Sequence, residues 1–271
     1  MIKTRSRMKK IVLIGFGAIG EYVAEHLPEG IELAAVVEVP ENIPALVARF
    51  TGKPIEVVSC INDLSMTPDL VLEVAGQAAL KMHGEAVLRF GWPLTIVSVG
   101  ALADEVFHNN LKQAAKEGNS RYWLLPGALG GIDALSAAKR TGLEHVSYQS
   151  LKSIEGWRGT HAENLIDLDS VTEATCFFKG SAREAATLFP KNANVAATIA
   201  LAGAGFEATD VELWCDPNPI KNRHTIDVKG VFGDFTITIK GNPLAKNPKT
   251  SMLAALSVLH ACDNLVALEW V

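Results

Sequence analysis

A glycine-rich turn between a buried strand and a helix is the feature that most constrains the fold of this chain. The apolar run Ile11–Ile14 leads directly into residues 15–20, which read G-F-G-A-I-G. A G-x-G-x-x-G sequence alone is a weak signal, but between a strand and a helix it indicates a dinucleotide-binding βαβ unit. Gly15 then makes the tight turn, Gly17 lets backbone approach a pyrophosphate, and Gly20 lets the helix pack on the strand. The alternative is a purely structural turn.

The residues around this turn predict which dinucleotide binds. The helix N-terminus offers N–H groups and a partial positive charge, so Ala18 and Ile19 join the glycines as candidate phosphate-binding residues. The second predicted strand ends at Glu38, where a carboxylate accepts hydrogen bonds from both ribose hydroxyls of NAD and repels a 2′-phosphate. The sequence therefore predicts NAD, with NADP assisted by Arg49 as the alternative. The structural alternative for Glu38 is a solvent-exposed residue at a strand end.

Short β-branched runs alternate with helical stretches through the first half, which is the pattern of a parallel sheet covered by helices on both faces. Strands are expected at 10–15, 32–38, 55–58, 70–74, 94–99 and 122–125, and helices at 18–27, 44–50, 77–90 and 104–117. Ala75 and Gly100 follow two of these strands, at the edge where open parallel sheets bind ligands. Their small size suits contact with the nicotinamide half of a dinucleotide.

The second half has longer alternating runs, which favour an antiparallel sheet with one wet face. Strands are expected at 209–215, 223–229 and 234–240, and helices from Ser181, where Glu184 completes a capping box, and at 195–203. A last helix is expected from Pro248, with Asn247 as its N-cap. The predicted fold is α/β: a Rossmann-type doubly wound parallel sheet in residues 1–125 and 248–271, and an α+β domain with a mainly antiparallel sheet in residues 126–247.

Composition excludes several classes of protein. The net charge of -5 argues against a nucleic-acid binder, and no apolar run approaches the roughly 18 residues of a membrane span. The four cysteines are far apart and suggest no disulfide framework, so a reducing cytoplasm is expected. The sequence shows no His, Cys and Glu cluster with metal-ligand spacing, so no metal is expected. A small-molecule substrate is the favoured partner.

Three segments of the second half resemble the L-aspartate dehydrogenase family. They are P-G-A-L-G-G-I-D-A-L at 126–135, F-P-K-N-A-N-V-A-A at 189–197 and N-P-K-T-S at 247–251. Together with the glycine loop, the resemblance runs from about Met8 to the end of the chain. It implies NAD(P)-dependent oxidative deamination of L-aspartate to oxaloacetate and ammonia through iminoaspartate, and a link to NAD biosynthesis. It also implies a homodimer, a second domain for catalysis and dimerisation, and a C-terminal helix that packs back on the nucleotide domain.

The resemblance also implies roles for individual residues. His224 matches the catalytic histidine of the family, and Ala128 and Asn194 match its cofactor contacts. Alternation places His224 on the same strand face as Ile226 and Val228, and an imidazole there suits proton transfer. From the residues alone, a packing histidine is the alternative for His224, and an N-cap is the alternative for Asn194.

A dicarboxylate substrate needs positive charge or N–H donors to replace the water it loses. Lys249, Thr250 and Ser251 can supply these at the start of the expected last helix, with capping and domain docking as the alternative. Lys152 is a further candidate for substrate binding. Relatives commonly carry Arg-Lys-Pro there, whereas residues 151–153 read L-K-S, so the Lys is kept and the Arg is lost.

Two other functions stay open at this point. One is another two-domain dehydrogenase, such as a homoserine dehydrogenase or a dihydrodipicolinate reductase, which shares the glycine loop. The other is a non-enzymatic protein that senses NAD. A substrate panel separates the first from aspartate oxidation, and nucleotide binding without turnover would indicate the second.

Overall fold

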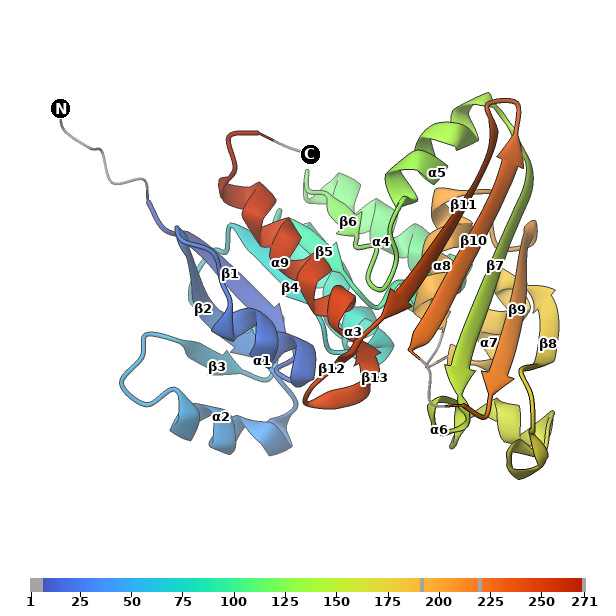
Figure 1. Cartoon of the computed structure of the whole chain (residues 1–271). Helices are drawn as coiled ribbons and strands as arrows, with labels where there is room; N and C mark the ends of the chain where they lie inside the picture. Colours follow the sequence, from blue (N-terminus) through green and yellow to red (C-terminus); the bar gives the residue numbers. More distant parts are fainter. Residues whose placement is uncertain (1–6, 191–192, 219–220, 270–271) are drawn as a thin grey trace. The chain divides into compact units, whose positions relative to one another are not determined.

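The chain forms two compact units (Figure 1). The computed structural model describes residues 7–190, 193–218 and 221–269, without the side chains of Pro248 and Lys249. The first unit comprises the chain up to Leu125 and from Ala255 onward, and the second is Pro126–Ala254. The second boundary therefore falls inside the last helix and not at the predicted residue 247.

A six-stranded sheet forms the centre of the first unit. Its order is β3-β2-β1-β4-β5-β6, and every pairing is parallel. The strands are β1 (Lys9–Ile14), β2 (Ile31–Val37), β3 (Glu56–Val58), β4 (Leu70–Glu73), β5 (Leu94–Ile96) and β6 (Tyr122–Leu124). β1 lies beside β4, which comes much later in the chain, so the strand order reverses between them. This order is that of a Rossmann fold, and it confirms the predicted doubly wound sheet.

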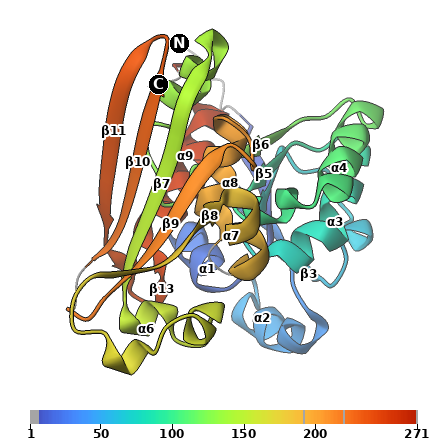
Figure 2. The same ribbon diagram turned by 90° about the vertical axis from the view of Figure 1, so that its right-hand side faces the viewer.

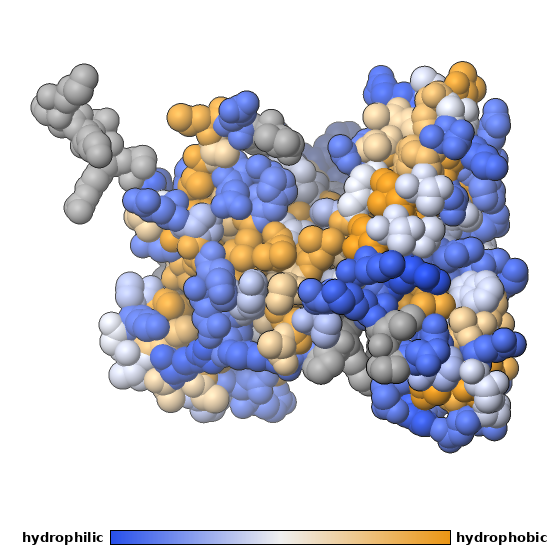
Figure 3. Space-filling view, in the orientation of Figure 1, coloured by the Kyte–Doolittle hydropathy of each residue, from blue (hydrophilic) through white to orange (hydrophobic). Residues whose placement is uncertain are grey.

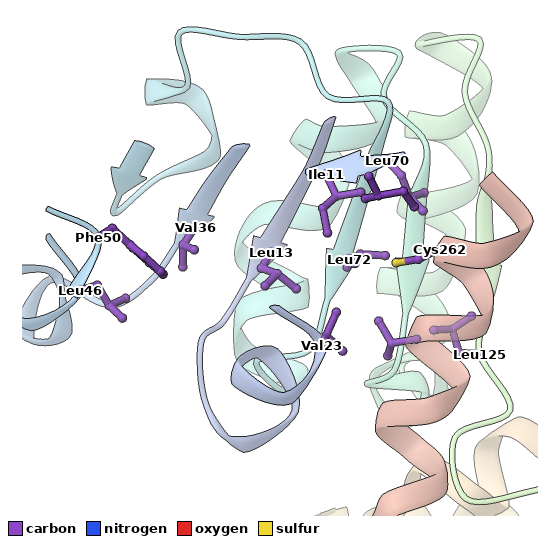
Figure 4. Packing of buried hydrophobic residues seen from close by; sticks show 12 residues of the cluster. Ile11, Leu13, Val23, Val36, Leu46, Phe50, Leu70, Leu72, Leu125 and Cys262 are labelled. Atoms are coloured by element: carbon purple, nitrogen blue, oxygen red, sulfur yellow. The ribbon is translucent and has the colours of Figure 1, made fainter. Parts of the chain in front are cut away.

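Helices cover both faces of this sheet. They are α1 (Ala18–Glu25), α2 (Ile43–Arg49), α3 (Gln77–Arg89), α4 (Glu105–Glu117) and α9 (Met252–Val266), with 3₁₀ turns η1 (Pro40–Asn42), η2 (Ile61–Asp63) and η3 (Val99–Ala103). On one face, side chains of β1, β2 and β4 pack with α1, α2 and α9 in one apolar cluster (Figure 4). On the other face, α3 packs beside α4 (Figure 2).

The C-terminal helix belongs to the core of the first unit, as the resemblance implies. Val258 and Cys262 of α9 are fully buried in the same cluster as Leu13 of β1 and Leu72 of β4. Burying side chains of this size stabilises a fold by about 1.5–3 kcal/mol each, so α9 is part of the nucleotide-domain core and not an appendage.

The second unit contains a five-stranded mixed sheet of order β11-β10-β7-β9-β8. Its strands are β7 (Leu143–Ser153), β8 (Thr175–Ser181), β9 (Thr209–Asp216), β10 (Asn222–Gly230) and β11 (Gly233–Gly241). Only the β7–β9 pairing is parallel, so the expected, mainly antiparallel sheet is confirmed. The sequence analysis did not predict β7 or β8.

Helices α7 and α8 lie on one face of this sheet (Figures 1 and 2). The described helices of the second unit are α5 (Ile132–Ala138), α6 (Ile154–Trp157), α7 (Ala182–Leu188) and α8 (Ala193–Ala202), with 3₁₀ turns η4 (Lys139–Thr141), η5 (His161–Asn164) and η6 (Leu168–Ser170). The predicted capping box is present, since Ser181 and Glu184 bond each other's backbone N–H. Along β10, Ile226 and Val228 are buried and alternate with more exposed residues. One face of the sheet is therefore apolar, as predicted.

The start of the last helix differs from the prediction. Residues Asn247–Ser251 form strand β13, which pairs with β12 (Pro243–Leu244), and α9 begins at Met252. The Met252 N–H donates to the Asn242 carbonyl, which closes this small ribbon. Strand pairing therefore overrides the local helix-start signal of Asn247 and Pro248, because Pro is tolerated at the edge of a sheet. Strand β5 also ends three residues early, because η3 begins at Val99.

The surface mixes hydrophilic and apolar residues in the view of Figure 3. Apolar side chains such as Val47, Met82 and Val106 are exposed singly on helices of the first unit. Among the described residues, no helix has both the length and the apolar character needed to cross a membrane.

Candidate functional site

The glycine loop of the first unit has the geometry expected of a phosphate-binding turn. Gly15 has φ +96°, and a Cβ on it would lie 2.5 Å from the Cβ of Ala75. A Cβ on Gly20 would lie 2.4 Å from the Gly15 carbonyl oxygen, so the helix contacts the turn there. A Cβ on Gly17, by contrast, would meet no heavy atom within 4 Å. Gly15 and Gly20 are thus required by packing, whereas Gly17 leaves open space for a ligand.

Gly17 is also the N-cap of α1, so Ala18 and Ile19 occupy the first helical positions. The first N–H groups of a helix have no partner within the helix, and the helix dipole adds partial positive charge beside them. The loop and helix therefore present donors around an open position, which is the chemistry that a pyrophosphate requires.

Glu38 lies beside this loop. One of its oxygens accepts a 2.7 Å hydrogen bond from the Phe16 N–H, and the other accepts from the Val39 N–H and the Asn42 amide. The carboxylate follows β2 directly and is partly exposed. This is the place at which a Rossmann fold holds the adenosine ribose, so the geometry fits NAD.

Arg49 has other partners in this structure. Its guanidinium is ion-paired with Glu21 and Glu25 of α1, and it stacks over the Phe16 ring at 5.2 Å. Use of this side chain for a 2′-phosphate would require it to leave these carboxylates. In the described contacts, Arg49 is thus held by the carboxylates of α1 and by Phe16.

Glu73 fixes the two turns that follow strands β4 and β5 at the carboxyl edge of the sheet. Its carboxyl is fully buried at the end of β4 and accepts bonds from the backbone N–H groups of Ala75, Gly76 and Ser98 and from the Ser98 hydroxyl, at 2.8–3.0 Å. Burial raises the pKa of Glu73, and these donors oppose that rise. One side chain thus fixes the turns after β4 and β5. Sequence analysis singled out the small residues here but not this acid.

The predicted nicotinamide-side residues occupy these same turns. Ala75 is exposed and packs against Gly15, which brings the turn after β4 to the glycine loop. Gly100 is buried inside η3. The first unit therefore gathers the glycine loop, Glu38 and Ala75 along the carboxyl edge of its sheet. These residues fit a dinucleotide, because the loop offers N–H donors and open space at Gly17 for phosphate and Glu38 offers an acceptor for ribose.

In the second unit, His224 is a buried side chain with a defined hydrogen-bond partner. It lies on β10, is 5% exposed, and its Nδ1 is 2.8 Å from the Tyr148 hydroxyl oxygen. Ser150 is the neighbour of His224 across the β7–β10 pairing and also hydrogen-bonds Tyr148. Burial raises the pKa of Tyr148 far above its ordinary value, so the phenol stays neutral. His224 is therefore a buried histidine whose Nδ1 has a hydrogen-bond partner.

Burial and the nearby charge of Lys152 together lower the pKa of His224 to about 4. Lys152 itself is partly buried near the end of β7, with its Nζ 4.8 Å from the centre of the Trp157 ring. Burial lowers the pKa of Lys152 to about 8. The predicted catalytic histidine and one predicted substrate-binding lysine thus belong to one cluster.

Two of these side chains were missed by sequence analysis. Tyr148 and Ser150 lie on β7, which was not predicted because polar residues interrupt its alternation. The buried side chains Val146, Tyr148 and Ser150 nevertheless recur at every second position. That period is the signal that would have found the strand and its contact with His224.

The other predicted residues of the second unit lie in three separate elements. Ala128 is in the turn after Pro126, and Asn194 is the second residue of α8 and not its N-cap, so the capping interpretation is wrong. Thr250 and Ser251 lie in β13 and not at a helix start. The Ser251 hydroxyl oxygen is buried and has no hydrogen-bond partner among the described residues. Lys249 is in the same strand, and its side chain lies outside the described part of the chain.

Within the residues that the structure describes, no group of three or more His, Cys, Asp or Glu side chains is arranged to hold a metal ion. Arg158, another cation near this region, pairs with Glu155 and Asp169, which raise its pKa. Lys152 is a cation whose charge acts on His224.

Two family models match different parts of this chain. Residues 15–125 match the family model described as homoserine dehydrogenase, NAD binding domain, and residues 133–265 match the one described as aspartate dehydrogenase, C-terminal. The crystal structure of aspartate dehydrogenase from Thermotoga maritima superposes with a TM-score of 0.74 at 26% identity, covering 98% of this chain and 99% of that one. A dihydrodipicolinate reductase from Paenisporosarcina, at 13% identity and a TM-score of 0.53, shares the fold alone.

The curated relatives are more similar still. The L-aspartate dehydrogenase of Acinetobacter baylyi is 52% identical over 259 residues, which cover 96% of this chain and 98% of that protein. The L-aspartate dehydrogenase of Serratia proteamaculans is 48% identical with the same coverage. The resemblance inferred from the motifs is therefore confirmed, and this chain belongs to the L-aspartate dehydrogenase family.

Proposed function

We propose that this chain catalyses the NAD(P)-dependent oxidative deamination of L-aspartate to oxaloacetate and ammonia through iminoaspartate. The observation that carries the proposal is the 52% identity with a curated L-aspartate dehydrogenase across nearly the whole of both chains. The glycine loop of the first unit and the His224 cluster of the second supply the two kinds of group that such a reaction needs. The glycine loop binds a dinucleotide, and the His224 cluster takes part in the proton transfers of the reaction.

The first unit holds the cofactor in this proposal. The loop at Gly17 and the N–H groups of Ala18 and Ile19 bind the pyrophosphate, Glu38 binds the ribose, and the turns after β4 and β5 receive the nicotinamide half. When bound, NAD⁺ accepts the hydride that leaves Cα of aspartate. The resemblance adds Ala128 and Asn194 of the second unit as cofactor contacts.

The second unit binds and orients the substrate. Tyr148 holds the Nδ1 side of His224, which leaves Nε2 as the imidazole atom that can contact the reacting nitrogen or the water that hydrolyses the imine. With its pKa lowered to about 4, the imidazole is neutral at any ordinary working pH, so it serves as a hydrogen-bonding partner. Lys249, Thr250 and Ser251 are proposed to bind the carboxylates, and the unpartnered Ser251 hydroxyl supports this assignment.

A substrate panel tests the function directly. We expect NADH formation with L-aspartate and none with D-aspartate, L-glutamate, L-alanine or L-homoserine. His224→Ala should lower kcat by roughly 10²- to 10⁴-fold and leave NAD affinity unchanged, because its imidazole is proposed to hydrogen-bond the reacting nitrogen or the attacking water and not the cofactor. Full activity in this variant together with a loss of about 1–3 kcal/mol of stability would return His224 to a packing role.

A homoserine dehydrogenase-like activity is the second candidate, and one observation favours it. The family model that matches the first unit describes the NAD-binding domain of homoserine dehydrogenases. The second unit, which carries the proposed substrate site, matches the aspartate dehydrogenase model instead. Turnover of L-homoserine in the same panel would reverse the choice, and NAD binding without any turnover would favour a sensor.

Four further properties belong to the same proposal. We propose a preference for NAD over NADP, supported by Glu38 and by the paired Arg49. We also propose a homodimer, a link to NAD biosynthesis and a cytoplasmic location, the first two supported by the family resemblance and the last by four free cysteines. The second unit would then carry both catalysis and dimerisation. Light scattering of the purified protein tests the dimer.

A further inference from the structure

We propose that Lys152 is a catalytic residue of this site, and that its ε-amine accepts the proton released by the substrate ammonium group. The inference rests on the proposed function and deepens it, because it assigns the proton to Lys152 and keeps His224 as a neutral hydrogen-bonding partner. The ammonium N–H bond breaks and a bond from hydrogen to Nζ forms. The Cα–H bond then breaks with its electron pair leaving as hydride to NAD⁺, and the nitrogen lone pair forms the C=N bond.

The sheet places Lys152 beside His224. Tyr148, Ser150 and Lys152 stand on one face of β7, since side chains two residues apart share a face. His224 lies directly across from Ser150 in the antiparallel β7–β10 pairing. Lys152 is therefore a diagonal neighbour of His224, at a separation that long side chains span. Its charge acts on the imidazole, since it is one of the two causes that lower the pKa of His224.

An aromatic wall shelters the Lys152 amine. Its Nζ lies 4.8 Å from the centre of the Trp157 ring, and Trp157 is fully buried, with its indole N–H donating to the Trp214 carbonyl. Phe177 and Phe189 contact Trp157 edge to face. The ring that Lys152 contacts is thus held rigidly by its own neighbours. Apolar shelter of this kind disfavours the charged amine, which is how enzymes prepare a lysine as a base.

Several titratable groups of the described residues lie around Lys152. On the sheet they are His224 and Tyr148, both neutral at ordinary pH, and Cys215 of β9, whose Cα pairs with that of Lys152 and whose pKa is raised by burial. On α6, Glu155 is exposed and paired with Arg158. Burial lowers the pKa of Lys152 to about 8.

The two candidate bases, His224 and Lys152, differ in how strongly they bind a proton. A general base works best when its pKa lies near the operating pH, because it must be deprotonated before the reaction and basic enough to take the proton. His224, at about 4, is always deprotonated but too weakly basic to retain a proton from an ammonium group. Lys152, at about 8, satisfies both conditions under mildly alkaline conditions.

The competing role for Lys152 is to bind a substrate carboxylate as a permanent cation. That role needs only charge, so arginine would preserve it in part, whereas a base needs a neutral amine, which arginine cannot supply because its pKa exceeds about 12. The two roles therefore separate in Lys152→Arg and in the pH dependence of kcat.

The test compares pH profiles of the purified full-length protein and its variants with L-aspartate and NAD⁺. We expect kcat of the wild type to rise to a plateau with an apparent pKa near 8, and Lys152→Arg and Lys152→Ala to lose roughly 10²- to 10⁴-fold in kcat. Small primary amines should restore part of the activity of Lys152→Ala and none of that of His224→Ala. Lys179→Ala is the matched control, since Lys179 is exposed and paired with Glu212, and its activity should equal that of the wild type.

A second measurement does not depend on turnover. Competitive acetylation at a series of pH values, read by mass spectrometry, gives the pKa of each lysine, and we expect about 8 for Lys152 and a value above the ordinary one for Lys179. NADH binding by Lys152→Ala, measured by fluorescence, checks that the variant is folded.

Two results would overturn the inference. One is Lys152→Ala with a raised KM for aspartate but an unchanged kcat and pH profile, which would make Lys152 a carboxylate-binding residue. The other is acetylation that titrates above pH 10 at Lys152. Failure of the wild type to oxidise L-aspartate is a separate outcome, which would refute the proposed function while the acetylation result still reports on the amine.

Discussion

The cofactor assignment predicts opposite behaviour for two glycines that are three residues apart. Gly17 has φ -75° and ψ -160°, and a Cβ there meets no heavy atom within 4 Å. Gly17→Ala should therefore change the free energy of unfolding by less than about 1 kcal/mol, because alanine tolerates this conformation and loses only some N-cap preference. Gly20→Ala forces a Cβ to 2.4 Å from the Gly15 carbonyl oxygen and should destabilise the first unit by about 1–3 kcal/mol.

For Gly17→Ala we expect weaker nucleotide binding, although the stability of the fold should hardly change. A methyl group at this position occupies the space through which the backbone approaches a pyrophosphate, so NADH affinity should fall at least about tenfold, equivalent to about 1.4 kcal/mol. The assay pairs urea unfolding with a fluorescence titration of NADH for each variant. A Gly17→Ala protein that is as stable as the wild type and binds NADH equally well would show that the open position does not receive phosphate, and the cofactor site would have to lie elsewhere.

Other perturbations test the remaining contacts. Glu38→Ala should lower the ratio of kcat/KM with NAD to kcat/KM with NADP. An unchanged ratio would show that Glu38 does not select the cofactor. Tyr148→Phe should lower kcat about tenfold with KM for NAD unchanged, because one buried hydrogen bond to the imidazole is lost; equal activity would deny Tyr148 a positioning role. Glu73→Ala should cost about 2–4 kcal/mol in urea unfolding against about 1 kcal/mol for Ser98→Ala, since three backbone N–H groups and the Ser98 hydroxyl lose their acceptor. Because the pKa of His224 falls from 6.5 to about 4 on folding, stability is full above pH 6.5 and is lost as pH falls toward 4, by about 3 kcal/mol at pH 4; acid titration of the unfolding free energy should show a smaller loss in His224→Gln.

The first unit was predictable because its signals are local. Each strand of the parallel sheet is a continuous apolar run, and each helix has one apolar face, so the alternation of the two periods specifies a doubly wound sheet. The roles of Gly15 and Gly20 also follow from spacing in a known context. Glu73 was not predictable as a clamp, because its partner Ser98 is 25 residues away and the bonds exist only when β4 and β5 lie side by side.

In the second unit, contacts between residues far apart in the chain limited what could be predicted from the sequence. Alternation placed His224 correctly on the buried face of β10, but the strand that carries its partners was missed because polar residues interrupt it. At the C-terminus, Asn247 and Pro248 have the local signature of a helix start, and pairing with β12 makes them a strand instead. In both cases contacts across the sheet outweigh a local preference of a few tenths of a kcal/mol to about 1 kcal/mol.

The sequence by itself determined the glycine turn, the two periods of apolar residues and the family motifs, since each depends on residues close together in the chain. Only the tertiary structure decided that Tyr148, 76 residues before His224, bonds its imidazole and that Lys152 lies beside both. The reason is that strand register sets which distant side chains share a face, and burial then sets their charge. The pKa values of His224 and Lys152, and with them the division of proton chemistry proposed for this site, are consequences of that packing.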